Sequence, residues 1–427
     1  MRILVDGYNL ALPQGTGVAT YGRTLIAAAH ALGHDVGVLY GVPRPSRSTN
    51  LLNEIAIADP AEMVPIRRSK WTRWIEPLYT ARTGIGSISA VEIALTGQVI
   101  GSPSRQVEAN RAWAANDVYR RAIGLFRKTG VGSRVNVPGV QLAHWTYPLP
   151  LEAKGAANVY TLHDLVPLRL PYATADEKRV YLKLCKRIAA RADHIVTVSE
   201  ASRRDIVDLL GVPESRVTNT YQSVDIPESV KAVTEDTLSR YVEGLFGVGL
   251  RGYFLFFGAI EPKKNVMRLL EAYLSSGVRT PLVIVGAPGW GGESDTNMLK
   301  QLRALDSDGR LIWWDYLPRD MLAMVIAGAK ATLFPSLYEG FGLPVAESMA
   351  MGTPVLTSDG SSLAEISGDA ALLVDPYSVA AITRGIQALD ADPDLCADMA
   401  ARGKVQSARF SPEAYQGGLA KLYEQFA

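Results

Sequence analysis

Two glutamates bracket a glycine-rich stretch of the chain, YEGFGLPVAE, which runs from Tyr338 to Glu347. Between Glu339 and Glu347, Gly340 and Gly342 let the backbone come close to a ligand with its N–H groups pointing outward. Such a loop suits a phosphate group, while the carboxylates would bind a ribose or face a reacting centre. The alternative is a glycine turn whose glutamates are solvated or cap the following helix.

A pair of lysines provides a second group with suitable chemistry. Lys263 and Lys264 lie in the turn EPKKN, directly after the apolar run YFLFFGAI. A leaving nucleoside diphosphate develops negative charge, and a fixed cation beside it stabilises that charge. The alternative is a solvated lysine pair in a surface turn, because charged residues are common on protein surfaces.

Three further polar residues stand at the ends of two predicted strands. His163 and Asp164 end the run NVYTLHD, and Ser199 ends the run HIVTVS. His163 is expected either to contact the substrate or to be a hydrogen-bonded core histidine. Ser199 is expected either to line a cleft or to be the N-cap of a helix predicted over Glu200 to Leu210.

These residues need a scaffold, and the chain shows two series of apolar runs that alternate with segments of helical spacing. Continuous apolar strands with helical crossovers predict parallel sheets covered on both faces. We expect an α/β protein with two Rossmann-like domains, residues 1–225 and 226–409, and a helix at about 410–427 packed back on the first domain. Ligands of such sheets bind at the carboxyl ends of the strands, so the cleft between the domains is the expected site. The strands are predicted at 2–8, 35–40, 158–164 and 194–199, and then at 253–260, 281–286, 311–317, 331–336, 354–358 and 371–375.

The composition limits the classes of protein that fit. The chain has 427 residues, which suits two or three domains, and a net charge of +1, which gives no general attraction for nucleic acid. Cys185 and Cys396 match no metal-binding spacing and suit a reducing cytoplasm. Asp6 interrupts the position of a signal peptide, and no stretch reaches the roughly 18 apolar residues of a membrane-spanning helix.

Taken together, the motifs resemble glycosyltransferase family 4, whose members are retaining enzymes of the GT-B fold. The resemblance covers both halves of the chain in the expected order. It implies two Rossmann-like domains with parallel sheets that face a central cleft, with the acceptor on the N-terminal side and a nucleotide-sugar donor on the C-terminal side. The matching stretches are residues 15–25, 160–171, 196–206, 256–273 and 334–376.

The resemblance also implies roles for the loop residues. Glu339 would contact the transferred sugar near its reacting carbon, and Glu347 would bind the ribose of the nucleotide. Lys263 and Lys264 would bind the diphosphate. The backbone amides that would hold the sugar and diphosphate belong to Gly340, Phe341, Gly342 and Leu343.

Residues of the N-terminal half complete the implied site. Gly17 would approach the diphosphate, and His163 would lie near the reacting sugar, with Asp164 orienting it or the acceptor. One departure from the family concerns the strand glycine, which many relatives follow with Arg but which Ala259 follows here. The two lysines must then provide more of the binding to the diphosphate. A lysine cannot form the paired hydrogen bonds that the planar guanidinium of Arg makes.

The implied reaction is retaining transfer of a hexose from a nucleotide diphosphate sugar to a glycan or a lipid-linked glycan. The motifs look closest to bacterial mannosyl- and rhamnosyltransferases of surface polysaccharide assembly, such as O-antigen, so GDP-mannose is favoured and UDP- or dTDP-sugars stay open.

We favour front-face displacement over an enzyme nucleophile, because only Glu339 and Asp164 are suitably placed carboxylates. No metal or other cofactor is expected, and the D-x-D triplets at 306–308 and 390–392 are interpreted as solvated.

Three alternatives to a transferase stay open: a nucleotide-sugar epimerase, a phosphorylase of the same fold, and a non-catalytic nucleotide-sugar-binding subunit. A non-catalytic subunit should have lost Glu339 or the lysine turn, and this chain keeps both. Residues 65–84 add a basic, tryptophan-bearing helical pattern that suits peripheral contact with an anionic membrane surface. The alternative is an amphipathic helix packed on the N-terminal domain.

Overall fold

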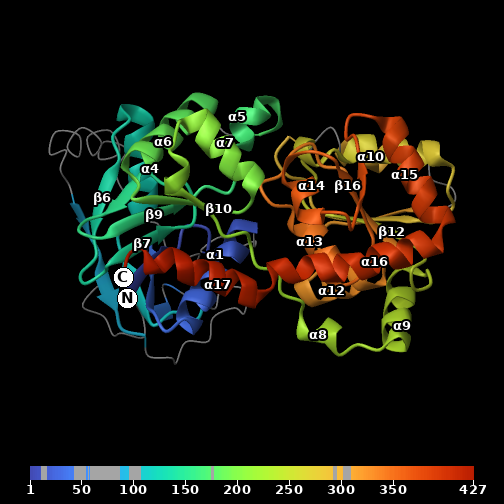
Figure 1. The fold of residues 1–427 in the computed structure, drawn as a ribbon, viewed down its shortest axis with the longest axis horizontal. Coiled ribbons are helices and arrows are strands. Elements are labelled where there is room, and N and C mark those ends of the chain that lie inside the picture. Colours follow the sequence, from blue (N-terminus) through green and yellow to red (C-terminus); the bar gives the residue numbers. More distant parts are fainter. Residues whose placement is uncertain are drawn as a thin grey trace.

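The chain folds into two α/β lobes that lie side by side (Figure 1). The computed structural model describes residues 1–10, 17–42, 54–55, 57, 87–95, 107–174, 177–291, 296–301 and 309–427. The predicted amphipathic helix at 65–84 and the triplet at 306–308 lie outside these residues. Within the described ranges, no helix combines the length and the apolar character that crossing a bilayer requires.

The N-terminal lobe is built on an eight-stranded sheet of order β11-β10-β9-β7-β1-β2-β5-β4, in which every pair is parallel except β4 with β5. Buried Val, Ile, Leu and Ala side chains fill its strands, as expected for a sheet covered on both faces. The strands are β1 (Arg2–Asp6), β2 (Asp35–Tyr40), β4 (Val91–Ile93), β5 (Arg111–Ala114), β7 (Leu142–Trp145), β9 (Ala157–Thr161), β10 (His194–Thr197) and β11 (Val217–Asn219). A small second sheet contains β3 (Ser87–Ser89), β6 (Ser133–Asn136) and β8 (Leu151–Ala153). The helices are α1 (Gly17–Ala31), α4 (Val118–Thr129), α5 (Val166–Arg169), α6 (Lys178–Arg191) and α7 (Glu200–Leu210).

The C-terminal lobe contains a six-stranded, fully parallel sheet of order β14-β13-β12-β15-β16-β17. Its strands are β12 (Phe254–Phe257), β13 (Leu282–Val285), β14 (Leu311–Trp314), β15 (Ala331–Phe334), β16 (Val355–Ser358) and β17 (Leu372–Val374). Its helices are α8 (Glu228–Lys231), α9 (Glu235–Phe246), α10 (Val266–Ser276), α12 (Arg319–Gly328), α13 (Leu343–Ala350), α14 (Ser361–Ser367), α15 (Val379–Ala391) and α16 (Pro393–Ser407). The strand order reverses between β12 and β15, which is the point where such sheets bind ligands.

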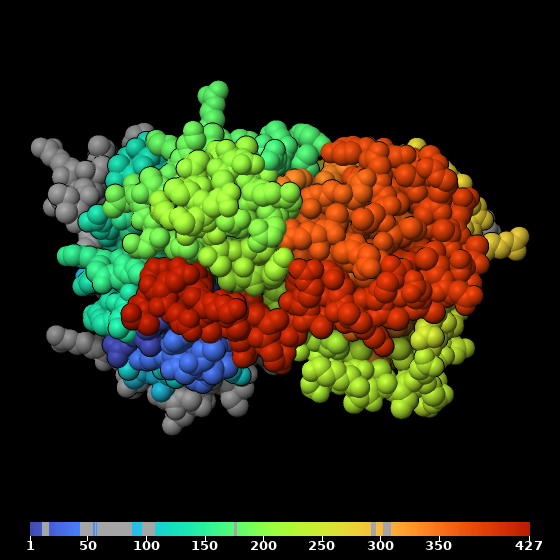
Figure 2. Space-filling model, in the orientation of Figure 1, coloured from blue at the N-terminus to red at the C-terminus, as the bar shows by residue number. Residues whose placement is uncertain are grey.

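The last helix, α17 (Pro412–Glu424), leaves the C-terminal lobe and packs against α1 of the N-terminal lobe (Figures 1 and 2). The Tyr423 hydroxyl hydrogen-bonds Nδ1 of the buried His144 at 2.8 Å. Burial lowers the pKa of His144 to about 3, with help from the charges of His163 and His194, so this histidine is a neutral part of the core. The C-terminal segment therefore ties the two lobes together at a second place besides the 217–228 connection.

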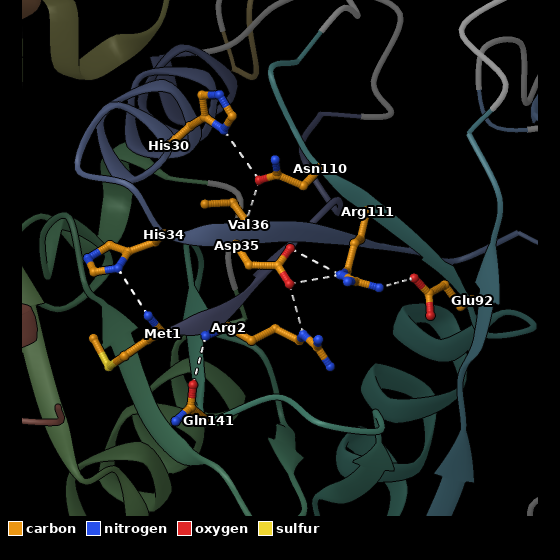
Figure 3. Close-up of polar contacts among 10 residues, drawn as sticks. All are labelled: Met1, Arg2, His30, His34, Asp35, Val36, Glu92, Asn110, Arg111 and Gln141. Atoms are coloured by element: carbon orange, nitrogen blue, oxygen red, sulfur yellow. Dashed lines mark hydrogen bonds and ion pairs between the residues drawn. The ribbon is translucent and has the colours of Figure 1, made fainter.

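An ion-pair ladder joins the amino ends of three neighbouring strands in the N-terminal lobe (Figure 3). Asp35 at the start of β2 lies between Arg2 of β1, at 3.0 Å, and Arg111 of β5, at 2.9 Å. Arg111 continues the ladder to Glu92 of β4 at 2.6 Å. Burial raises the pKa of Asp35, but hydrogen bonds from both arginines outweigh it and leave the pKa below its ordinary value. This ladder lies at the opposite end of the sheet from the strand ends that lead to His163 and Ser199.

Candidate active site

The glycine-rich loop connects β15 to α13 at the carboxyl edge of the C-terminal sheet. Gly342 is the N-cap of α13 with φ of 102°, a left-handed conformation that favours glycine. A Cβ at Gly340 would lie only 2.6 Å from the carbonyl oxygen of His163, so glycine is needed for the close approach of the two lobes. The ring of Phe341 packs against the ring of Phe410, with centroids 5.3 Å apart. The side chain is thus used for packing, and the backbone of Phe341 forms part of the loop.

Glu339 lies at the strand end of this loop and is 7% exposed. Its Oε1 accepts hydrogen bonds from Lys264 Nζ at 2.6 Å and from Ser336 Oγ at 2.7 Å. Burial raises the pKa of Glu339, but the positive charges of Lys264 and Lys263 and these hydrogen bonds outweigh it and hold the pKa below its ordinary value. The carboxylate is therefore ionised and fixed at neutral pH.

Hydrogen bonds connect the lysine turn to the same loop. Pro262–Lys264 forms a 3-10 turn that ends at Asn265, whose φ is 62°. The side-chain amide of Asn265 donates to the carbonyl oxygens of Pro335 at 2.9 Å and Pro376 at 2.7 Å. The carbonyl oxygen of Lys263 accepts from the Leu337 N–H at 2.8 Å. These bonds explain how two segments about 75 residues apart place Lys264 on Glu339.

Glu347 has a different environment. It lies in the second turn of α13, and its side chain is partly buried. No protein group among the described residues hydrogen-bonds its carboxylate. Burial raises the pKa of Glu347 to about 7, and the charge of Arg319 opposes this rise only in part. A partly buried carboxyl group without a protein partner is suited to accept hydrogen bonds from a ligand.

The N-terminal lobe brings His163 and Asp164 to the back of the loop. Nε2 of His163 donates to the carbonyl oxygen of Thr146 at 2.9 Å, and its ring stands edge-on to Tyr21 with centroids 4.7 Å apart. Burial lowers the pKa of His163, opposed by Thr146 and Asp164, so the ring is neutral. Oδ1 of Asp164 accepts from the Val166 N–H at 3.0 Å. The role of Asp164 in orienting the ring or the acceptor stays a prediction.

Gly17 begins α1 and faces the loop from the other lobe. A Cβ at this glycine would lie 3.7 Å from Cδ1 of Leu343, the first residue of α13. The structure thus brings Gly17, the His163–Asp164 pair, the lysine turn and the glycine-rich loop at 338–347 to one place between the lobes.

The N-cap interpretation of Ser199 is confirmed, and its fully buried side chain bonds the other lobe rather than lining an open cleft. Its Oγ accepts from the Ser202 N–H at 3.0 Å as the N-cap of α7, and donates to the carbonyl oxygen of Gly340 at 2.7 Å. The sequence analysis missed Ser202 and Glu365, which also join the two lobes at this loop. Both lie inside the matching stretches 196–206 and 334–376, but nothing in the sequence singled them out as contacts between the lobes.

The expected solvation of the triplet at 390–392 holds for Asp392, which is exposed, but only in part for the half-buried Asp390. Asp390 accepts hydrogen bonds from Lys330 Nζ at 2.7 Å and from Thr280 Oγ1 at 2.6 Å. Asp392 is the N-cap of α16 and accepts from the Leu395 N–H at 2.9 Å. Both carboxylates serve the fold of the C-terminal lobe. The described part of the chain contains no group of three or more His, Cys, Asp or Glu side chains that could hold a metal ion.

Comparison with known proteins agrees with this geometry. The model of the family "Glycosyltransferase Family 4" matches residues 111–227, and that of "Glycosyl transferases group 1" matches residues 250–406. The chain is 34% identical over 263 residues to O-antigen chain mannosyltransferase B of Escherichia coli, covering 60% of this chain and 67% of that protein. It is 26% identical over 275 residues to the serotype-specific mannosyltransferase WbdA of Escherichia coli, covering 62% of this chain and 33% of that protein.

Among solved structures, sucrose-phosphate synthase from Thermosynechococcus elongatus superposes with a TM-score of 0.68 at 17% identity, covering 100% of this chain and 98% of that one. This similarity shows the fold. The chain belongs to glycosyltransferase family 4, and it is a glycosyltransferase of the GT-B fold. The predictions of family, fold and enzyme class are confirmed.

Proposed function

We propose that this enzyme transfers mannose from GDP-mannose to a glycan or a lipid-linked glycan with retention at the anomeric carbon. The observation that carries the proposal is the pairing of Glu339 with Lys264 at the cleft edge of the C-terminal sheet. An ionised carboxylate and a cation 2.6 Å apart would face a sugar and its departing diphosphate together. The mannosyltransferase relatives support mannose as the sugar.

Each group of the site then has a task. An ammonium group has three N–H donors, so Lys264 would keep its bond to Glu339 and use the others on the diphosphate. Lys263 and the amides of Gly340 to Leu343 would add positive potential at the start of α13. These groups would supply the charge that the leaving diphosphate needs, so we propose a reaction without a metal cofactor.

The transferred sugar and the nucleotide would be held by different lobes. His163 would contact the sugar from the N-terminal lobe, and Glu347 would accept hydrogen bonds from the ribose. Glu339 is already bound by Lys264 and Ser336, which suits a fixed electrostatic partner better than an attacking nucleophile. We therefore propose front-face displacement, in which the departing phosphate takes the proton of the acceptor.

The acceptor is proposed to be a growing surface polysaccharide, such as an O-antigen chain on a lipid carrier, at the inner face of the membrane. The basic, tryptophan-rich composition of residues 65–84 supports peripheral membrane contact.

A thermal-shift panel of GDP-mannose, UDP-glucose and dTDP-rhamnose tests the donor, followed by an assay of GDP release with synthetic mannosyl oligosaccharides. We expect stabilisation by GDP-mannose alone and release of GDP that depends on the oligosaccharide. Stabilisation by a UDP- or dTDP-sugar in its place would overturn the choice of donor.

A further inference from the structure

The carboxylate of Glu365 crosses from one lobe to the other. Glu365 lies on α14 of the C-terminal lobe, and its two oxygens accept from the N–H groups of Glu200 at 2.8 Å and Ala201 at 2.9 Å. These are the first two amides of α7 in the N-terminal lobe. The first amides of a helix have no partner within it and carry its positive end, so a carboxylate is well suited to bind them.

The same turn of α7 holds the glycine loop directly. The carbonyl oxygen of Gly340 accepts from the hydroxyls of Ser199 at 2.7 Å and Ser202 at 3.2 Å. Both serines are almost fully buried, at 0% and 1% exposure. A second contact lies two residues earlier, where the Tyr338 hydroxyl donates to Asp205 of α7. Contacts from the N-terminal lobe thus lie on both sides of Glu339.

The first turn of α14 holds the peptide of Glu339 itself. The hydroxyl of Ser361 accepts from the Glu339 N–H at 3.3 Å, and the hydroxyl of Ser362 donates to the Glu339 carbonyl oxygen at 2.9 Å. Ser361 has φ of 56°, a left-handed conformation that is uncommon for serine. The loop, α7 and α14 therefore form three sides of one arrangement, in which each side bonds the other two.

We propose that Glu365 is a positioning residue for the transfer reaction. Glu365 joins α14 to the first turn of α7. The two helices together then fix the backbone position of Glu339. The carboxylate of Glu347, on α13, makes no hydrogen bond to α7 or α14 among the described residues, although the loop of this arrangement leads directly into α13. Loss of Glu365 should then slow the chemical step more than it weakens nucleotide binding. This kinetic part of the inference rests on the proposed function, whereas the structural part does not.

The structural part is tested by hydrogen–deuterium exchange on the full chain without ligand. Glu365→Gln and Glu365→Ala are compared with the wild type and with Glu271→Gln, a matched change of an exposed glutamate on α10. We expect faster exchange at 200–202 and also at 338–342, with the β12 amides unchanged. Faster exchange at 200–202 alone, in both variants, would overturn the proposal, because Glu365 would then only cap α7.

The kinetic part uses GDP release from GDP-mannose and calorimetry with GDP. We expect kcat of Glu365→Gln to fall about tenfold, as for a modest displacement of a catalytic group. The dissociation constant for GDP should stay within about twofold of the wild type. An unchanged kcat, or an equal loss of kcat and GDP affinity, would contradict the positioning role. Failure of the wild type to use GDP-mannose would instead count against the proposed donor, and the exchange experiment would decide the role of Glu365 without it.

Discussion

The two ends of the glycine-rich loop carry the same type of side chain in opposite surroundings. At the strand end, Glu339 has a cation 2.6 Å away, and its pKa is held below the ordinary value because the lysines outweigh the effect of burial. At the helix end, Glu347 has no bonded protein partner in the described part of the chain, and burial raises its pKa to about 7. The comparison shows that the spacing of the two glutamates indicates only that a site is present. The groups that bond each carboxylate indicate what that carboxylate does.

The largest effect is expected from removal of the partner at the strand end. Lys264→Ala leaves the buried carboxylate of Glu339 with the Ser336 hydrogen bond and the charge of Lys263 among the described residues, and it removes a cation from the proposed diphosphate site. We expect transfer to lose about 2–4 kcal/mol of transition-state stabilisation, as for other electrostatic groups in enzyme sites. The variant should also unfold at a lower temperature, because breaking a buried ion pair leaves an uncompensated charge. Steady-state kinetics and calorimetric melting measure the two effects.

The matched control for this change is Lys330→Ala. Lys330 forms an ion pair with Asp390 at 2.7 Å in the same lobe, away from the glycine-rich loop. Its side chain is 21% exposed, against 13% for Lys264. It should lower the melting temperature and leave kcat unchanged. If the Lys263→Ala, Lys264→Ala double variant turned over as fast as the wild type, the lysine turn would have no part in the reaction.

A smaller effect is expected from pH at the helix end. Because the pKa of Glu347 is about 7, the carboxyl group is mostly protonated at pH 6 and mostly ionised at pH 8. The ionised form is the better acceptor for ribose hydroxyls, so the affinity for GDP-mannose should rise over this interval, by up to about tenfold for a single titrating group. Titration calorimetry at several pH values measures the rise. Glu347→Gln should remove it, and a rise that persisted in this variant would assign it to another group.

The smallest effect is expected from an ion pair away from the loop. Arg111→Ala breaks the ladder of Asp35 and Glu92 at the amino ends of the N-terminal strands, where the side chains are 33–50% exposed (Figure 3). Such exposed pairs are screened by water and salt. We expect a small fall in melting temperature that shrinks at high salt, with kcat unchanged. A clear loss of turnover would show that ion pairs far from the glycine-rich loop also control the reaction. The surroundings of Glu339 and Glu347 would then not be enough to explain the reaction.

Much of the fold followed from the sequence because continuous apolar strands and helical spacing are local signals. The strand from 253 to 260 and the helix from Glu200 to Leu210 were recognised in this way, the latter with its bounds. The resemblance placed Glu339, Lys264 and His163 at one site, and the structure brings them together. It did not predict that Lys264 bonds Glu339 or that Thr146 orients His163, because those partners lie 75 and 17 residues away. Nor could it show that Glu365 reaches α7, since that contact depends on how the two lobes meet.

The division of labour between Glu339 and Glu347 is tested most directly by measuring GDP binding and GDP-mannose turnover on two variants at pH 8, where both carboxylates are ionised. Glu347→Gln should weaken GDP binding by about 1–3 kcal/mol, the value of a lost charge-assisted hydrogen bond. Glu339→Gln should leave GDP binding nearly intact and lower kcat, because its interaction forms mainly as the sugar reacts. Equal loss of GDP affinity in both variants, or no change in either quantity, would contradict the assignment of the two glutamates to different tasks.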